Sequence, residues 1–210
     1  IEGNMKKLWS LRACLPVALM ATFLSVLVGC GGGTGGNSEA NGKPGIPHKQ
    51  SADAVHAVMM ADRTVYAQHV VDRLKAQESV VKPDEYWHDE DGTIPLPAQM
   101  FRMGAELVSE NEEAGFSYSL KSKWPLNEQN KANSDLEVAG LDYVTANPEE
   151  NFYGEEELAG VNYYTAVYAD VAVAGACSNC HNSHANRGDD YPEFKTGDVM
   201  GGVIIRIPMR

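Results

Sequence analysis

A five-residue motif near the C-terminal end constrains this 210-residue chain more than any other feature. Cys177 and Cys180 are separated by two residues, and His181 follows directly. This C-x-x-C-H pattern is the attachment signature of c-type haem. Thiols three residues apart lie one helical turn apart and can add to two vinyl groups of one porphyrin, while the adjacent imidazole reaches the iron. The motif therefore predicts one covalent haem c, held by Cys177 and Cys180, with His181 as an iron ligand.

Three other chemistries use the same residue types. A structural zinc ion would take Cys177, Cys180, His181 and His184, but these lie within eight residues, and adjacent ligands strain a tetrahedral shell. A thioredoxin-like redox pair needs a βαβ context, which the pattern does not show. A disulfide between Cys177 and Cys180 would be strained. These alternatives stay open, and haem attachment is preferred.

The first 30 residues predict export. Lys6 and Lys7 follow Met5, an apolar stretch covers residues 13–28, and Gly29 precedes Cys30. A basic start, an apolar run and a small-residue exit form a secretory signal. Residues 27–30, Leu-Val-Gly-Cys, resemble the lipobox of bacterial lipoproteins, in which the cysteine is lipidated and the chain is cut before it. A plain secretory signal or a membrane anchor is the alternative, although about 16 apolar residues are few for a spanning helix.

We therefore expect a signal peptide over residues 1–29, lipidation of Cys30, a flexible glycine-rich tether over 30–50, and a haem domain over 51–210. The protein would be lipid-anchored on the periplasmic side of a bacterial membrane. Gly31 is not the aspartate associated with inner-membrane retention, which favours the outer membrane.

The charge balance excludes one class of partner. The chain has 29 Asp and Glu against 17 Lys and Arg, a net charge of −12. Nucleic-acid binding needs a basic face, so no nucleic-acid partner is expected. Acidic runs such as Glu149–Glu150 and Glu155–Glu157 are interpreted as solvated surface.

Hydrophobic periodicity predicts an α+β domain. Ser51 is a plausible N-cap for a helix to about Gln77, and a second helix from Pro97 would place Met100, Met103, Gly104 and Leu107 on one face and end near Gly115. Further segments are a loop over 82–97, strands over 116–120, 161–169 and 199–208, and a helix over 134–146. Helices followed by alternating strands favour an antiparallel sheet packed against helices.

From about Val55 onward the chain resembles a known family, the bacterial single-haem, c-type, PAS-like sensory domains. These form extracytoplasmic parts of histidine kinases, adenylate cyclases and chemotaxis receptors. The resemblance is carried by residues 63–66, 94–98, 124–127, 168–170, 176–184 and 194–201. It implies a PAS-like antiparallel sheet with long N-terminal helices, and haem on Cys177, Cys180 and His181. Two residues depart from the pattern: Ala185 replaces a frequent proline, and Met200 a frequent arginine. If that arginine holds a haem propionate, this haem is held otherwise.

The second axial ligand of the iron is less constrained. We prefer Met100, because it lies in the first turn after Pro97, on a helix that the resemblance places near the haem. Met103 and His69 are the next candidates, since thioether and imidazole both suit haem iron.

Together these features predict a membrane-anchored mono-haem c-type cytochrome lipoprotein that acts in extracytoplasmic electron transfer or redox sensing and is not an enzyme. Its partner would be a redox protein or a sensor-kinase-type protein. The alternative is a haem-based sensor subunit that binds CO, NO or O2 and signals through a partner. A peroxidase has little support, because no distal acid–base pair is evident.

Overall fold

The structure is a computed structural model that describes residues 45–209. The signal peptide, Cys30 and most of the predicted tether lie outside the described residues. Within 45–209, no helix is both long enough and apolar enough to span a membrane.

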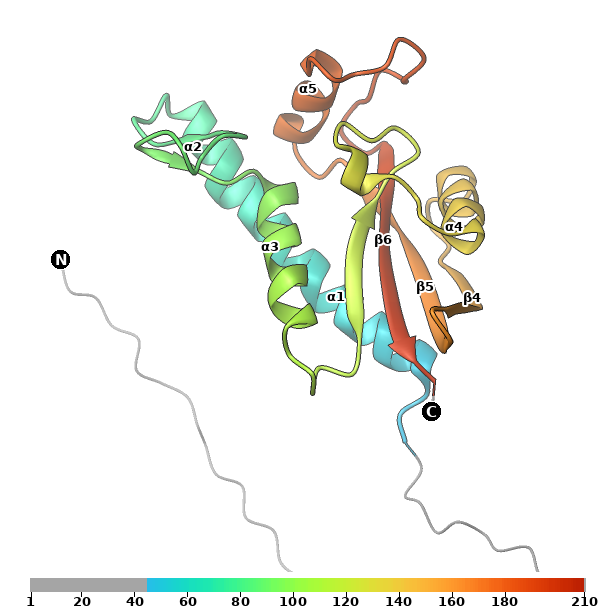
Figure 1. Cartoon of the computed structure of the whole chain (residues 1–210). Coiled ribbons are helices and arrows are strands. Elements are labelled where there is room, and N and C mark those ends of the chain that lie inside the picture. The colour runs from blue at the N-terminus through green and yellow to red at the C-terminus, as the bar shows by residue number, and fades with distance from the viewer. Residues whose placement is uncertain (1–44, 210) are drawn as a thin grey trace, which may run out of the picture. The chain divides into compact units, whose positions relative to one another are not determined.

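One long helical segment opens the domain (Figure 1). It consists of α1 (His48–Val65), the π-helical segment η1 (Tyr66–Asp72) and α2 (Arg73–Ala76). The prediction that Ser51 caps this helix is wrong, because Pro47 occupies the N-cap position and its carbonyl accepts a hydrogen bond from Ser51 N at 3.0 Å. Proline is tolerated at a helix start, where backbone N–H groups have no helical acceptor. The last residues of the predicted tether, 48–50, therefore belong to α1.

Four antiparallel strands form the main sheet, in the order β3-β6-β5-β4. They are β3 (Ser117–Lys121), β4 (Phe152–Leu158), β5 (Val161–Val171) and β6 (Val199–Pro208). The sequence predicted β3, β5 and β6. It missed β4, whose run of three glutamates was interpreted as solvated surface. Glu155 and Glu157 are exposed as expected, but Glu156 points inward and accepts hydrogen bonds from Thr165 and Arg206.

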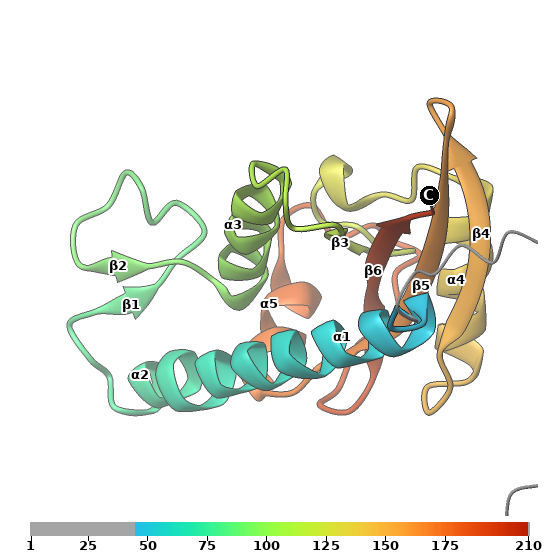
Figure 2. The same ribbon diagram turned by 90° about the horizontal axis from the view of Figure 1, so that it is seen from below.

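Helices cover both faces of this sheet (Figure 2). On one face, Ala52 of α1 and Phe101 of α3 (Pro97–Ser109) pack against Ala166, Tyr168, Val203 and Ile205. On the other face, Val144 of α4 (Asp135–Ala146) packs against Val167 and Ile204. Neighbouring strand residues thus alternate between the two cores, as the two-residue period of a strand requires.

The helix α4 packs closely on its face of the sheet. Ser134, the first residue of the helix predicted over 134–146, caps α4, with its hydroxyl accepting from Glu137 N at 3.1 Å. A Cβ atom on Gly140 would lie 2.5 Å from Cγ2 of Val167, so only glycine allows this helix to approach the sheet.

The remaining elements are a second, smaller sheet, a short 3-10 helix and the helix that carries the motif. A small parallel sheet pairs β1 (Lys82–Pro83) with β2 (Thr93–Ile94) inside the predicted loop, and η2 (Glu128–Asn130) follows β3. The motif itself forms α5 (Gly175–Ser183). The predicted α+β class, with an antiparallel sheet and a long N-terminal helix, is confirmed.

Candidate functional site

The helix that carries the motif is held at its first turn by the long N-terminal segment. Asp72 of η1 accepts a hydrogen bond from Ala176 N at 3.2 Å, which gives one free N–H group of α5 an acceptor. Gln68 of the same segment donates to the carbonyl of Val173 at 2.9 Å. The π-helical turn therefore fixes where α5 begins and, with it, the position of the motif.

His181 has a defined tautomer. Its Nδ1 lies 3.1 Å from the carbonyl oxygen of Cys177. Because a carbonyl can only accept, Nδ1 must carry the proton, and Nε2 keeps its lone pair. A histidine that ligates a metal commonly donates its other ring N–H to a backbone carbonyl in this way. Burial is the main cause that lowers the pKa of His181, so the ring is held in the neutral form that can ligate.

A second contact fixes the imidazole plane. The ring of Phe194 meets the ring of His181 edge to face, with centroids 5.9 Å apart. Phe194 is held in turn by Asn182, whose side chain accepts from Phe194 N at 2.8 Å and donates to its carbonyl at 2.7 Å. The residue after the motif therefore secures the aromatic ring that packs on the histidine.

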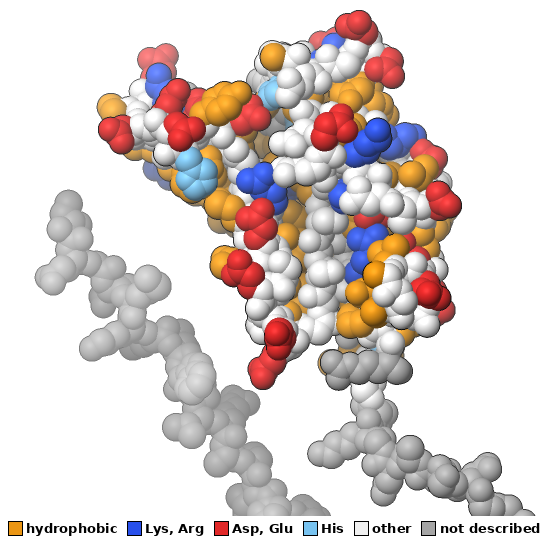
Figure 3. All heavy atoms as spheres, in the orientation of Figure 1, with side chains coloured by type: hydrophobic (Ala, Val, Ile, Leu, Met, Phe, Trp, Pro, Cys, Tyr) orange, Lys and Arg blue, Asp and Glu red, His pale blue; other side chains and the backbone are white. Residues whose placement is uncertain are grey.

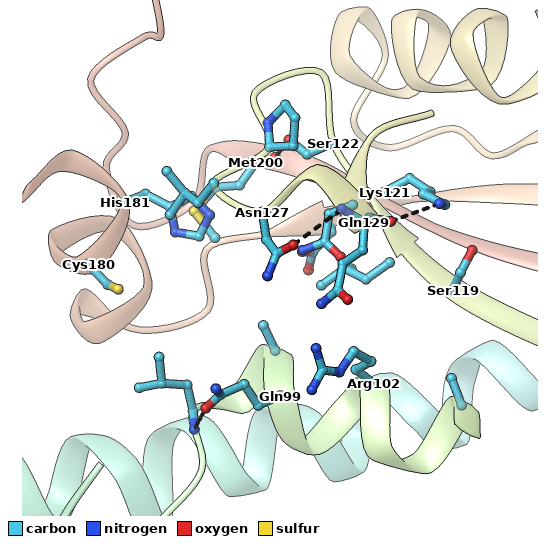
Figure 4. A pocket seen from close by; sticks show the side chains of 18 of the residues that line it. Gln99, Arg102, Ser119, Lys121, Ser122, Asn127, Gln129, Cys180, His181 and Met200 are labelled. Atoms are coloured by element: carbon cyan, nitrogen blue, oxygen red, sulfur yellow. Dashed lines mark hydrogen bonds between the residues drawn. The ribbon is translucent and has the colours of Figure 1, made fainter. Parts of the chain in front are cut away.

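Cys180 and His181 line a cavity of about 430 Å³ between α5, α3 and β3 with the loop after it. Figure 4 shows both motif residues at one end, with Gln99 and Arg102 of α3 along one side and Ser119 and Lys121 of β3 at the far end. The volume lies within the range of about 300–1,000 Å³ found for small-molecule and cofactor sites. The motif therefore opens onto a space suited to a prosthetic group.

The two thiols have different surroundings. Both are free and half-buried. Cys180 lines the cavity, and burial raises the pKa of its thiol. Cys177 packs beside the cavity against a cluster of Ala172, Phe194 and Met200. Met200 also lines the cavity and is buried, so one of the two residues that depart from the resembling family lies at the site itself.

The structure does not bring Met100 to the cavity. The residues of α3 that line it are Ala98, Gln99, Arg102, Ala105, Glu106 and Ser109. Met100 is two residues from both Ala98 and Arg102, which places it nearly opposite on a helix of 3.6 residues per turn. Met103 does not line the cavity either, and His69 is exposed on η1. This placement gives no support to the three predicted distal ligands.

Two ion pairs border the cavity. Arg63 of α1 and Asp170 of β5 form a buried pair on its wall, joined by both guanidinium Nη atoms. His184 Nε2 lies 2.9 Å from a carboxylate oxygen of Glu85, which links the end of α5 to the segment between β1 and β2. Arg63 and Asp170 had no predicted role. A signal was present, because Arg63 lies four residues after Met59 and interrupts the apolar stripe of the first helix.

The alternatives for the motif gain no support. Within residues 45–209, no three His, Cys, Asp or Glu side chains are grouped to hold a metal ion, so the zinc ligand set is not assembled. Cys177 and Cys180 form no disulfide in this part of the chain. The residues present do fit a haem group, since they combine two free thiols, an imidazole with a free Nε2 and an adjoining cavity.

A family model and a solved structure match this chain. The model of the Tll0287-like family, described as Tll0287, matches residues 47–208. A solved structure, titled "Crystal structure of the cyanobacterial heme-protein Tll0287", is similar at 16% sequence identity; the match covers 79% of this chain and 98% of that chain, with a TM-score of 0.47. No match was found among curated proteins. Because the family model covers most of the chain, this protein belongs to the Tll0287-like family.

Proposed function

We propose that this protein carries one haem c, bound covalently to Cys177 and Cys180 and ligated by His181. The observation that carries this proposal is the hydrogen bond from His181 Nδ1 to the Cys177 carbonyl, which leaves Nε2 free beside the cavity. Family membership adds support, because the family model bears the name of Tll0287, whose crystal structure is titled as that of a heme-protein.

Different residues of the chain would hold the haem and orient its histidine ligand. The two thiols fix its position on α5, while the Cys177 carbonyl and the Phe194 ring orient the imidazole. Arg63 and Asp170 place fixed charges on the cavity wall. A bound haem would supply one-electron exchange. The protein would then act in electron transfer or redox sensing rather than as an enzyme.

The compartment and partner belong to the same proposal. The signal pattern and Cys30 favour a lipid-anchored protein on the periplasmic side of a bacterial membrane, with the outer membrane preferred. Export is also required for haem c attachment, so motif and signal support each other. The partner would be a redox protein or a sensor-kinase-type protein. Acidic side chains are spread over the visible face in Figure 3, which suits a partner with a basic surface.

A second candidate function is supported by the α3 wall of the cavity. That wall presents Ala98, Ala105 and the polar side chains of Gln99 and Arg102. Small and polar residues of this kind leave room for a diatomic ligand and offer hydrogen-bond donors to it. The protein would then be a sensor subunit for CO, NO or O2 that signals through a partner.

One spectrum separates these functions. The exported protein is produced with haem-maturation machinery, and its reduced absorption spectrum is recorded before and after addition of CO. A haem band that CO leaves unchanged supports electron transfer or redox sensing, and a clear CO shift supports the gas sensor. Absence of a c-type haem band contradicts both.

A variant tests the ligand assignment. His181→Ala should leave haem attached through the two thioethers but change its spin state, because the imidazole is lost. The matched control is His184→Ala, three residues further along and paired with Glu85, which should leave the spin state unchanged. A normal spectrum for His181→Ala would contradict the assignment.

A further inference from the structure

The buried pair of Arg63 and Asp170 has features that fold stability alone does not explain. Each side chain is only about 5% exposed, and Arg63 Nη2 lies 3.2 Å from Asp170 Oδ2 in the second of two parallel contacts. The Nε of Arg63 is also buried and has no hydrogen-bond partner among residues 45–209. Burying two charges costs desolvation energy that their attraction only partly repays, so such a pair is weak evidence for a stabilising role.

The position of the pair points to the cavity instead. Arg63, Asp170 and His181 all line the same cavity. Arg63 also packs over the ring of Phe101, 5.7 Å from its centroid, so its guanidinium is held between α1, α3 and β5. Two residues after Asp170, the short segment 172–174 leads into α5. Both charges are therefore fixed on rigid elements close to the motif.

A fixed charge in such a place acts on a redox couple. When ferrous iron gives one electron to a redox partner and becomes ferric, the site gains one unit of positive charge. In a partly enclosed space of low effective dielectric constant, a nearby carboxylate favours the more positive state, and a nearby guanidinium opposes it. The two members of the pair therefore have opposite effects on the same equilibrium.

We propose that Arg63 and Asp170 are positioning residues that set the reduction potential of the haem, Arg63 by favouring the reduced state and Asp170 by favouring the oxidised state. The inference rests on the proposed function, which places the haem at His181. It assigns a redox role to two residues that lie outside the haem motif.

A potentiometric titration of variants tests this directly. Asp170→Asn removes the negative charge and should raise the midpoint potential, whereas Arg63→Met removes the positive charge and should lower it. Each change should shift the ratio of oxidised to reduced protein at a fixed ambient potential by on the order of tenfold. The double variant should return close to the unmodified protein, and Arg63→Lys, which keeps the charge, should stay close to it as well.

A second, partly buried ion-pair network in the same chain supplies the matched control. Arg206 pairs with Glu137 and Glu156 on the α4 face, and none of the three lines the cavity. Arg206→Met should therefore lower the urea midpoint for unfolding of the haem-bound protein but leave the potential unchanged. A merely structural role for Arg63 and Asp170 would give the same pattern as this control.

The outcomes separate the two proposals. If the unmodified protein takes up no covalent haem, the proposed function fails. If haem is bound but Asp170→Asn leaves the potential unchanged or lowers it, the inference is overturned. That result stands even where Arg63→Met does not fold, because Asp170→Asn preserves the shape of the side chain. The inference is supported if Asp170→Asn raises the midpoint potential. Arg63→Met should then lower the potential, or Arg63→Lys should leave it close to that of the unmodified protein.

Discussion

Two ion-pair networks lie on different sides of the sheet, the buried pair of Arg63 and Asp170 at the cavity and the partly buried network of Arg206 on the α4 face. On the α4 face, Arg206 donates to Glu137 at 2.7 Å and to Glu156 at 2.8 Å, and both acids accept from further groups of the fold. At the cavity, Arg63 has Asp170 as its acidic partner, and within residues 45–209 each network keeps one buried polar atom without a hydrogen-bond partner, Arg63 Nε and Glu156 Oε2. The first network ties helix to strand within a closed core, whereas the second lies on the wall of the candidate haem site. Disruption of the α4 face should therefore affect stability, and disruption of the cavity end should affect the cofactor.

The largest effect is expected at the cavity end. Replacing both Cys177 and Cys180 by alanine should abolish covalently bound haem, because no thiol remains in α5 to form a thioether. The fold should persist, since neither cysteine forms a disulfide in the described residues. Haem staining of a denaturing gel measures the loss. Ser183→Ala, an exposed change in the same helix, is the control and should stain normally. Haem that stays with the doubly substituted chain after denaturation would refute the attachment sites.

The next effect should appear on the α4 face. Glu137 is fully buried, and Glu137→Ala leaves Arg206 with Glu156 as its one remaining acidic partner. Because Arg206 keeps Glu156, the loss is that of hydrogen bonds to a buried charge, about 1.5–3 kcal/mol of unfolding free energy. Urea denaturation measures it, with the exposed neighbour Glu155→Ala as the control. Covalent haem should be unaffected. A Glu137→Ala variant that has normal stability but fails to attach haem would contradict the assignment of the α4 face to stability.

A smaller effect is expected from pH at His56 of α1. Its ring stacks on Tyr168 with centroids 3.8 Å apart, and burial lowers its pKa from 6.5 to about 4. Between these values the unfolded chain binds more protons than the folded one, so the free energy of unfolding should fall as pH drops from about 6.5 to about 4. His56→Gln should flatten this part of the stability profile, while His69→Gln, at an exposed position, should not. An unchanged slope in His56→Gln would show that the ring is not held neutral.

The smallest effect concerns helix capping. Ser134→Ala removes the side-chain acceptor for Glu137 N and should cost about 1 kcal/mol of unfolding free energy. Ser51→Ala is an informative control, because Ser51 lies one turn inside α1 rather than at its cap and should change stability little. Equal losses in thermal unfolding would contradict the capping assignment.

The sequence predicted features whose signals are local. The predicted strand 199–208 matches β6 over its full length, and the predicted helix 134–146 matches α4 with its cap Ser134. The motif also lies on a helix, as its spacing required. In each case the residues that determine the element lie within the element.

Features that depend on distant partners were missed. Arg63 and Asp170 are 107 residues apart, and no local pattern pairs them. Glu156 was predicted to lie on the surface, because its partners Arg206 and Thr165 belong to other strands. The predicted apolar face of the second helix was correct at Gly104, which lies close to Tyr118 of β3, and wrong at Leu107. Phe101 is its buried residue and Leu107 is 68% exposed, because the edge strand β3 and the cavity together decide which side faces inward.

The central claim is the covalent attachment of one haem to α5, and mass spectrometry of the exported protein tests it most directly. The protein is produced with haem-maturation machinery, treated with an alkylating reagent under denaturing conditions and digested. The account predicts that the peptide containing Cys177, Cys180 and His181 carries the mass of one haem and no alkyl group. The same peptide with two alkylated thiols and no haem would contradict it.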